Sequence, residues 1–271
     1  MSPLTPEAAV VIELMTNQGL DGKMLPIFLS HIVTGFLISV FAFIYYKGWR
    51  IEKNLEVNTN NEIKFNKEQI LSLLGLAIMI ISVIMFKVNV GLMAFAVGTI
   101  LVLLGAGDEK KAISKIPWNV ILLVLGVGVL MNIVSLSGGI TLMAEGMTKI
   151  MTAKTAPSIM AVSASVMSFF SSGLGVVFPT LIPTSSIIAD SLGISYYAKE
   201  LVTMVIVGGT FTGISPISTT GALIMSAVIS DEQVKDKFPQ NKLFLELVFW
   251  AFFTIILEVI LAYLGVYKLF F

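Results

Sequence analysis

Two short runs of small and hydroxyl-bearing residues interrupt an otherwise apolar stretch of this sequence. The first is Ser171-Ser172-Gly173-Leu174-Gly175, and the second is Gly213-Ile214-Ser215-Pro216-Ile217-Ser218-Thr219. Hydroxyl and unwound carbonyl oxygens suit a small hard cation, and the helix N-termini expected at Val176 and Ala222 offer amides to an anion. The chemistry indicated is the binding of a cation together with an anion. A plain turn and a simple proline kink are the alternative explanations.

The sequence contains few of the residues that covalent or metal-dependent catalysis requires. The chain has no cysteine and one histidine, which removes thiol nucleophiles, disulfides and two-histidine metal motifs. No Gly-x-Ser-x-Gly nucleophile elbow occurs. The net charge is zero and the 17 basic residues are spread over short loops, so nucleic acid is not an expected partner. We predict that the chain is not an enzyme and needs no cofactor; a membrane-embedded enzyme is a rival hypothesis.

The elements that position these runs are predicted to be membrane helices. Apolar residues make up 56% of the 271 positions and charged residues 13%, about half the charged share of a soluble domain. Five runs approach the roughly 20 residues that cross a bilayer, the third being marginal. They are Leu25–Tyr46, Ile70–Phe86, Val90–Gly105, Trp118–Ser137 and Leu243–Val266. The predicted fold is an all-α integral membrane protein.

The two polar runs lie in segments that differ from simple spans. Ala156–Phe170 and Val176–Asp190 are each about 15 residues long, which at 1.5 Å per residue is too short for a hydrocarbon core of about 30 Å. They are predicted to form a re-entrant helical hairpin with residues 171–175 at its tip. After Tyr196, one span is predicted to be broken from Gly208 to Gly221, around Pro216, which removes a backbone donor and disfavours helix at Ser215. This segment is predicted to be a discontinuous transmembrane helix.

The distribution of basic residues between the loops on the two sides of the membrane predicts the topology. The loops 47–69, 108–117 and 231–242 carry eleven basic residues, against six on the other side, so these loops are predicted to be cytoplasmic. The hairpin then enters from outside, and the protein is a multi-pass protein of the cell inner (plasma) membrane. We divide the chain into 1–23, 24–117 and 118–271. The last part comprises a span at 118–137, an interfacial helix at 139–151, the hairpin at 156–191, the broken helix at 197–230 and the last span at 243–266.

The beginning of the sequence shows a faint internal repeat. Ser2-Pro3-Leu4-Thr5 aligns with Ser215-Pro216-Ile217-Ser218 at a constant offset of 213, and the similarity continues through Ile12 and Met225. Inverted repeats are common in transporters, although chance also produces matches this short. If the repeat is real, Thr5 belongs to the broken helix of a first repeat, and the chain is expected to be a C-terminal-half fragment.

A family resemblance rests on three features: Trp118-Asn119 leading into Leu122-Leu123-Val124-Leu125-Gly126-Val127-Gly128, the Leu181-Ile182-Pro183 end of the hairpin, and the Ser215-Pro216 break. Together they resemble the divalent anion symporters of the ion-transporter superfamily. The sequence from Gly213 to Ala222 looks most like the malonate-carrier branch. It differs from the symporters in having Gly173-Leu174-Gly175 at the tip and Thr219-Thr220-Gly221 after the break.

The resemblance implies two inverted repeats, each with a re-entrant hairpin and a discontinuous helix, of which this chain holds the second. It implies secondary active transport of a small organic anion, a di- or tricarboxylate such as malonate or succinate, coupled to a sodium or proton gradient. By position, one implied cation and substrate site, with sodium as a possible metal, comprises Ser171, Ser172, Gly173, Gly175, Gly213, Ser215, Ser218 and Thr219. Thr5 belongs to the half-site of the first repeat.

The implied site is incomplete within this one chain. The expected partners are therefore a small carboxylate substrate, the lipid bilayer, and either the missing first half or a second copy of the chain. The alternative function is an accessory or channel-forming membrane subunit that completes its site with another chain.

Overall fold

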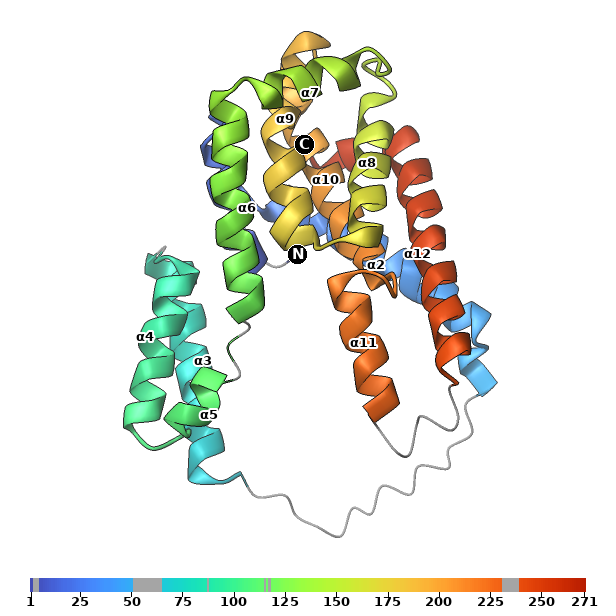
Figure 1. Ribbon diagram of the computed structural model, residues 1–271. Coiled ribbons are helices and arrows are strands. Elements are labelled where there is room, and N and C mark those ends of the chain that lie inside the picture. The colour runs from blue at the N-terminus through green and yellow to red at the C-terminus, as the bar shows by residue number, and fades with distance from the viewer. Residues whose placement is uncertain (2–4, 51–64, 87, 115, 117, 231–238) are drawn as a thin grey trace.

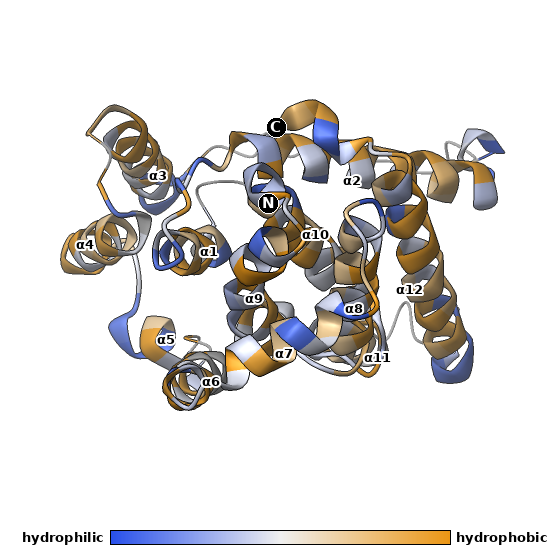
Figure 2. Ribbon diagram, turned by 90° about the horizontal axis from the view of Figure 1, so that it is seen from above, coloured by the Kyte–Doolittle hydropathy of each residue, from blue (hydrophilic) through white to orange (hydrophobic). Residues whose placement is uncertain are grey.

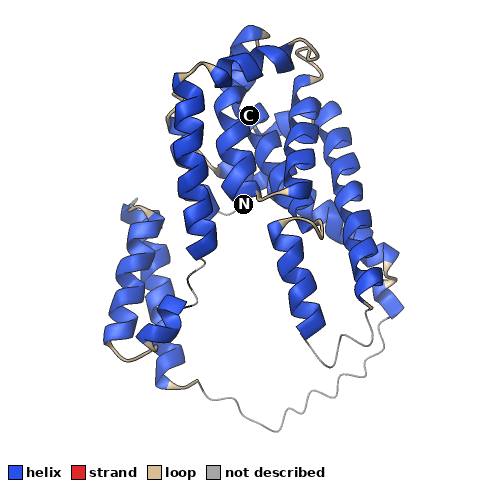
Figure 3. Ribbon diagram, in the orientation of Figure 1, coloured by secondary structure: helices blue, strands red, loops and turns tan. Residues whose placement is uncertain are grey.

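The computed structural model describes residues 1, 5–50, 65–86, 88–114, 116, 118–230 and 239–271, and its regular elements are all helical (Figures 1 and 3). The longer helices are α1 (Pro6–Thr16), α2 (Leu25–Tyr45), α3 (Lys67–Phe86), α4 (Val90–Leu103), α5 (Glu109–Ser114), α6 (Trp118–Leu136), α7 (Gly139–Thr148), α8 (Ala156–Phe170), α9 (Phe178–Ser191), α10 (Ala198–Phe211), α11 (Thr219–Ser230) and α12 (Gln240–Tyr263). Short helical turns are η1 (Gly48–Arg50), η2 (Gly173–Val177), η3 (Ser195–Tyr197), η4 (Thr212–Ile214) and η5 (Tyr267–Phe270).

Five helical stretches in the described part of the chain are long and apolar enough to cross a membrane. They differ sharply in how much protein surrounds them. Only 6% of the apolar window of α3 is buried, whereas 78% of the window within residues 195–228 is buried. In a bilayer the exposed apolar side chains of α3 face lipid, because hydrocarbon solvates them as well as protein does. The chain is therefore a multi-pass membrane protein with a protein-surrounded core.

The core consists of α8, α9 and α10, around which α1, α2, α6, α7 and α12 are arranged (Figure 2). Residues Leu201–Gly209 of α10 are all buried. Gly208 lets α10 approach α8 closely, since a Cβ there would lie 2.7 Å from the Ala161 carbonyl oxygen and from the Ser165 hydroxyl. Small residues at such crossings permit close backbone approach in membrane proteins. The core is thus built on short, tightly packed helices, and the long apolar ones lie outside it.

The structure agrees with most predicted element positions and corrects two of them. The first leg of the hairpin is α8, as predicted, but helical structure resumes at Gly173, three residues before Val176. The interruption near Pro216 is shorter than predicted, because α10 continues to Phe211 and α11 starts at Thr219. The fourth predicted span ends in a 79° bend at Gly138, after which α7 lies across that end of the molecule (Figure 1).

Three predicted features are not established by the helices described above. The Ser2-Pro3 end of the internal repeat and much of the loops 47–69 and 231–242 lie outside the described residues. The re-entrant character of α8 and α9, and the inverted repeat, stay predictions. The third predicted span, α4, is 14 residues long and so falls below the usual minimum of about 17 residues for crossing a bilayer.

An aromatic cluster joins α2 to α12 at the end where both helices meet their predicted cytoplasmic loops. The indole of Trp250 donates a hydrogen bond to the Tyr46 hydroxyl at 2.9 Å, and that hydroxyl donates to the Glu246 carboxylate at 2.9 Å. Tyr45 stacks on Phe249 with ring centroids 5.4 Å apart. Tyr and Trp are enriched where a bilayer meets water, because one edge of the ring is apolar and the other is polar. The cluster indicates the membrane–water boundary.

The predicted topology is open to a direct test, because the chain has no native cysteine. A cysteine replacing Lys110 in α5 should react with a membrane-impermeant maleimide only in inside-out vesicles. A cysteine replacing Glu145 in α7 should react only in right-side-out vesicles. Both positions are exposed. Labelling of both cysteines from the opposite side would show that the protein is inserted in the orientation opposite to the predicted one.

Candidate functional site

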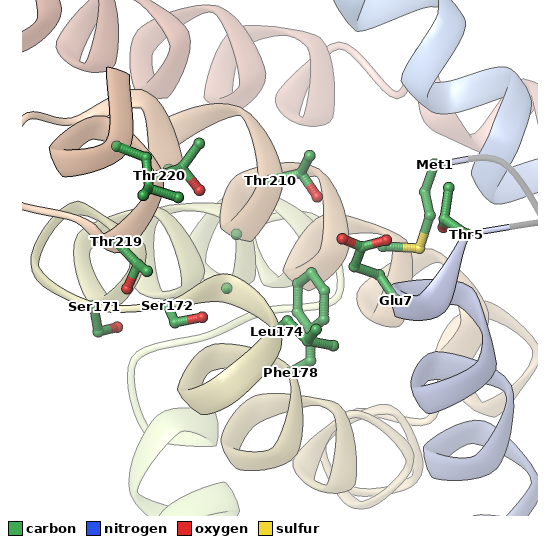
Figure 4. A pocket seen from close by; sticks show the side chains of 14 residues that line it. Met1, Thr5, Glu7, Ser171, Ser172, Leu174, Phe178, Thr210, Thr219 and Thr220 are labelled. Atoms are coloured by element: carbon green, nitrogen blue, oxygen red, sulfur yellow. The ribbon is translucent and has the colours of Figure 1, made fainter. Parts of the chain in front are cut away.

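A pocket of about 380 Å³ lies where the hairpin tip, the interruption after α10 and the start of α1 meet (Figure 4). It is the candidate site because segments more than 160 residues apart converge there. The lining residues are Met1, Thr5, Glu7, Ser171, Ser172, Gly173, Leu174, Phe178, Gly209, Thr210, Gly213, Thr219, Thr220 and Leu223. Six of the nine residues predicted from the sequence are among them: Thr5, Ser171, Ser172, Gly173, Gly213 and Thr219.

Ser172 ends the hairpin tip and caps the helix that follows. Its backbone is extended (φ −98°, ψ 126°), and its hydroxyl accepts a hydrogen bond from the Gly175 amide at 3.1 Å. Its carbonyl accepts from the amides of Val176 and Val177, which makes the first turn a wide π-type turn. This is the usual arrangement of a serine N-cap, in which the side chain satisfies one of the orphan amides at a helix start.

Ser218 performs the same role on the other side of the pocket. Its hydroxyl accepts from the Gly221 amide at 3.1 Å and lies within hydrogen-bond distance of two carbonyl oxygens, those of Gly213 and Ser215. Its carbonyl accepts from the Ala222 amide at 2.9 Å. Two helices therefore begin at the pocket, each capped by a serine that is followed three residues later by a glycine.

The two helices begin with their N-termini facing one pocket, and this changes which amides an anion can reach. The prediction that Val176 and Ala222 supply them is wrong, because both amides bond carbonyls within their own helices. Helix geometry leaves the amides of the preceding turn without intrahelical acceptors. Those of Gly173, Leu174, Thr219 and Thr220 belong to that turn, and all four residues line the pocket. Both positive dipole ends act on the same space.

The hairpin tip packs against α10 so closely that only glycine fits. A Cβ on Gly173 would lie 2.6 Å from the carbonyl oxygen of Gly209. That carbonyl already accepts a hydrogen bond from the Ser168 hydroxyl at 2.6 Å. The position of the tip is therefore set by contact between two backbones. Gly221 is as constrained, because a Cβ there would lie 1.8 Å from the Ser215 carbonyl oxygen.

The remaining predicted residues lie behind the lining. Gly175 and Ser218 are buried and take part in the two caps. Ser215 is buried in the interruption, where its hydroxyl accepts from the Ile217 amide at 3.4 Å. All nine predicted residues thus line the pocket or support its two helix starts. That they bind a cation and an anion stays a prediction.

Eight of the fourteen lining residues were not predicted from the sequence, and two of these, Glu7 and Thr210, have polar side chains with a distinct place in the pocket. Glu7 of α1 carries the only formally charged side chain in the lining, and its carboxylate points into the pocket from the side opposite Ser171 (Figure 4). Thr210 lines the pocket from α10, and its hydroxyl lies 3.4 Å from Nε2 of His31. Nδ1 of that histidine lies 3.0 Å from the Ile27 carbonyl, which can only accept, so the neutral ring carries its proton on Nδ1. The Thr210 hydroxyl then donates to Nε2.

No local signal in the sequence identified these two residues. Glu7 follows Pro6 in the first turn of a helix, where an acidic residue is common for reasons of helix stability alone. Thr210 lies in the predicted break of the span, before the run that begins at Gly213, and nothing in its sequence context distinguished it from its neighbours. The contribution of α1 to the pocket is a consequence of packing between distant segments.

Comparison with known proteins gives one finding. A family model described as "Citrate transporter" matches residues 6–208, three quarters of the 271 positions. The matched stretch begins with α1 and includes the hairpin and nearly all of α10. Searches of curated proteins and of solved structures gave no match.

Proposed function

The chain belongs to the citrate transporter family, and from this premise we propose that it carries citrate, or a smaller carboxylate such as malonate or succinate, by cation-coupled secondary transport. Membership agrees with the predicted resemblance to ion transporters and with the expectation that the chain is not an enzyme. The malonate-carrier branch and a location in the plasma membrane are finer points of the proposal. The observation that carries it is the convergence of two serine-capped helix N-termini on one pocket.

The helix starts suit a carboxylate for electrostatic reasons. Each contributes amide donors and the equivalent of about half a positive charge at its N-terminus. Two such ends, from η2 and α11, face the pocket. In a site surrounded by protein and lipid these partial charges are weakly screened, so they attract an anion more strongly than they would in water.

A bound coupling cation would neutralise part of the negative charge of the substrate and of Glu7. The described lining contains no Lys, Arg or His side chain; Glu7 adds a carboxylate, and the amine of Met1 interacts with it electrostatically. A di- or tricarboxylate entering beside Glu7 meets like-charge repulsion, which a sodium ion or a proton bound in the pocket would relieve. Hydroxyls and carbonyls near Ser171, Ser172 and Gly213 are suitable sodium ligands. We propose that the cation binds before the anion.

Substitution of Glu7 tests the proposed binding order, in which the cation binds before the anion. Glu7→Gln removes the negative charge and keeps the shape, so we expect citrate affinity to depend less on the coupling cation. The measurement is the half-saturating citrate concentration at high and low cation concentration. In the native protein it should rise steeply as cation is removed, and in the variant it should rise much less. Glu13→Gln, on the same helix and outside the pocket lining, is the control.

The experiment that tests the function is uptake of radiolabelled citrate, malonate and succinate into proteoliposomes, under sodium and proton gradients imposed separately. Concentrative uptake of one of the three supports the proposal and identifies the coupling ion. Absence of uptake and of exchange for all three contradicts it. The test is run with the chain alone and with a first-half segment supplied, because we propose that the site is completed by a first repeat or by a second copy.

One observation favours the alternative of a subunit that completes a site with another chain. The pocket is open beside α11, where Leu223 is 67% exposed and Ile217 in the interruption is 51% exposed. Apolar side chains at a pocket entrance are suited to contact with another protein segment. A channel-forming assembly would pass citrate down its gradient without accumulating it. Accumulation against a gradient therefore distinguishes the carrier from the channel.

A further inference from the structure

Glu258 is a fully buried carboxyl group that the proposed pocket does not use. It lies on α12 and is 0% exposed. The hydroxyl of Ser165 on α8 donates a hydrogen bond to its Oε2 at 3.1 Å. Its Oε1 has no hydrogen-bond partner in the described part of the chain. A buried carboxylate normally needs a cation or several donors, because removing it from water is unfavourable.

The elements packed around Glu258 supply no cation. Helices α8 and α11 and the turn η4 contain no charged or titratable side chain. On α10 the charged residues, Lys199 and Glu200, are in the first turn, and Lys199 pairs with Asp21, whose pKa its hydrogen bond lowers. Tyr267 of η5 is a nearby titratable group, and its hydroxyl bonds Thr34 at 2.8 Å. Helix α2, which packs on α12 through aromatic rings, carries Tyr45 in those ring contacts and His31, whose ring nitrogens lie beside the Ile27 carbonyl and the Thr210 hydroxyl. Among the residues that the structure describes, the carboxyl of Glu258 therefore has no counterion and one hydrogen-bond donor.

Glu258 is connected to the pocket through the serines of α8. Ser165 lies against Gly208, and one turn further along α8, Ser168 bonds the Gly209 carbonyl at 2.6 Å. Gly173 of the hairpin tip packs directly against that carbonyl. Ionisation of Glu258 would strengthen its hydrogen bond from the Ser165 hydroxyl. It would also attract water or a cation to the junction of α8, α10 and α12. The same junction fixes the distance between the tip and α10.

We propose that Glu258, with Ser165, is a proton-binding site that couples carboxylate transport to a proton gradient. This inference rests on the proposed function. Glu258 takes up a proton on the side from which the carboxylate binds and releases it on the other side as the junction opens. It acts on the pocket through α8 and does not touch the substrate. Intramembrane carboxyls with no structural counterion commonly serve as proton carriers.

The test is Glu258→Gln in the full protein, reconstituted in proteoliposomes, with two readouts. The first is citrate exchange at equal pH on both sides, which reports the proposed function. The second is citrate accumulation driven by a pH gradient, which reports coupling. With the membrane potential clamped at zero, one proton per citrate molecule gives about tenfold accumulation per pH unit. We expect the variant to retain exchange and lose accumulation. Gln keeps the shape and the acceptor for Ser165, so a merely structural role would leave both readouts unchanged.

Two further variants keep the inference testable if Glu258→Gln folds poorly. Ser165→Ala removes the hydroxyl that stabilises the ionised carboxylate, so the pH dependence of uptake should move to higher pH with the fold retained. Glu246→Gln, a half-buried carboxylate in the first turns of the same helix whose replacement keeps the acceptor for Tyr46, should match the native protein in both readouts. An unchanged pH profile in Ser165→Ala, or full accumulation by Glu258→Gln, overturns the inference while exchange still supports transport. Loss of exchange in the native protein overturns the proposed function itself.

Discussion

Replacing Gly221 by alanine is expected to abolish carboxylate uptake while leaving the protein inserted in the membrane. The added Cβ would lie 1.8 Å from the Ser215 carbonyl oxygen, a backbone atom that has no room to move away. Either the first turn of α11 unwinds or the interruption shifts, and in both cases the amides of Thr219 and Thr220 leave the pocket. Gly173→Ala should behave in the same way, because its Cβ would lie 2.6 Å from the Gly209 carbonyl oxygen.

The measurement is the initial rate of citrate uptake at matched protein content, with membrane insertion checked by extraction and size-exclusion profile. Gly98→Ala in α4 is the matched control. It makes the same chemical change within a helix, but nothing lies within 4 Å of the added Cβ. Native-like uptake by Gly221→Ala and Gly173→Ala would show that the geometry of the two helix starts does not matter for transport.

Removing both serine caps is expected to weaken citrate binding by roughly thirtyfold. An N-cap serine replaced by alanine costs about 1 kcal/mol, so Ser172→Ala with Ser218→Ala costs about 2 kcal/mol if the two effects add. The substitutions should destabilise the citrate-bound protein more than the free protein, because each cap orders the turn whose amides face the anion. The measurement is the citrate dependence of uptake, together with thermal unfolding at several citrate concentrations.

The two single variants complete a double-mutant cycle for the caps. The roughly thirtyfold loss is the value for independent caps. If both helix starts bind one anion, the double variant should depart from it, and the size of the departure measures the coupling. Ser72→Ala is the control, since this exposed hydroxyl bonds only the Glu68 carbonyl within α3. Reduced thermal stability with unchanged citrate affinity would mean that the caps are structural and that the anion binds elsewhere.

The sequence determined the features that depend on interactions within a few residues. Apolar runs of spanning length became α2, α3, α6 and α12, with ends close to those predicted. The two interruptions occur where serine, glycine and proline favour them, because Pro216 removes a donor and serine hydroxyls bond nearby backbone groups. The helix starts were predicted three residues late at both places, because the capping serines extend each helix back toward the interruption.

Tertiary structure decided what the interruptions form together. The tip at residues 171–175 and the interruption at 212–218 converge because glycines at 173, 208 and 209 let α8, η2 and α10 pack backbone to backbone. Packing also brought Glu7 to the pocket from the other end of the chain and buried Glu258 against Ser165. Hydropathy and turn chemistry describe each segment by itself, whereas the charge and the partners of a buried group depend on which distant helices surround it. For this reason the sequence predicted the elements of the candidate site, and only the packed structure showed that Glu7 lines the pocket and that Glu258 is buried behind it.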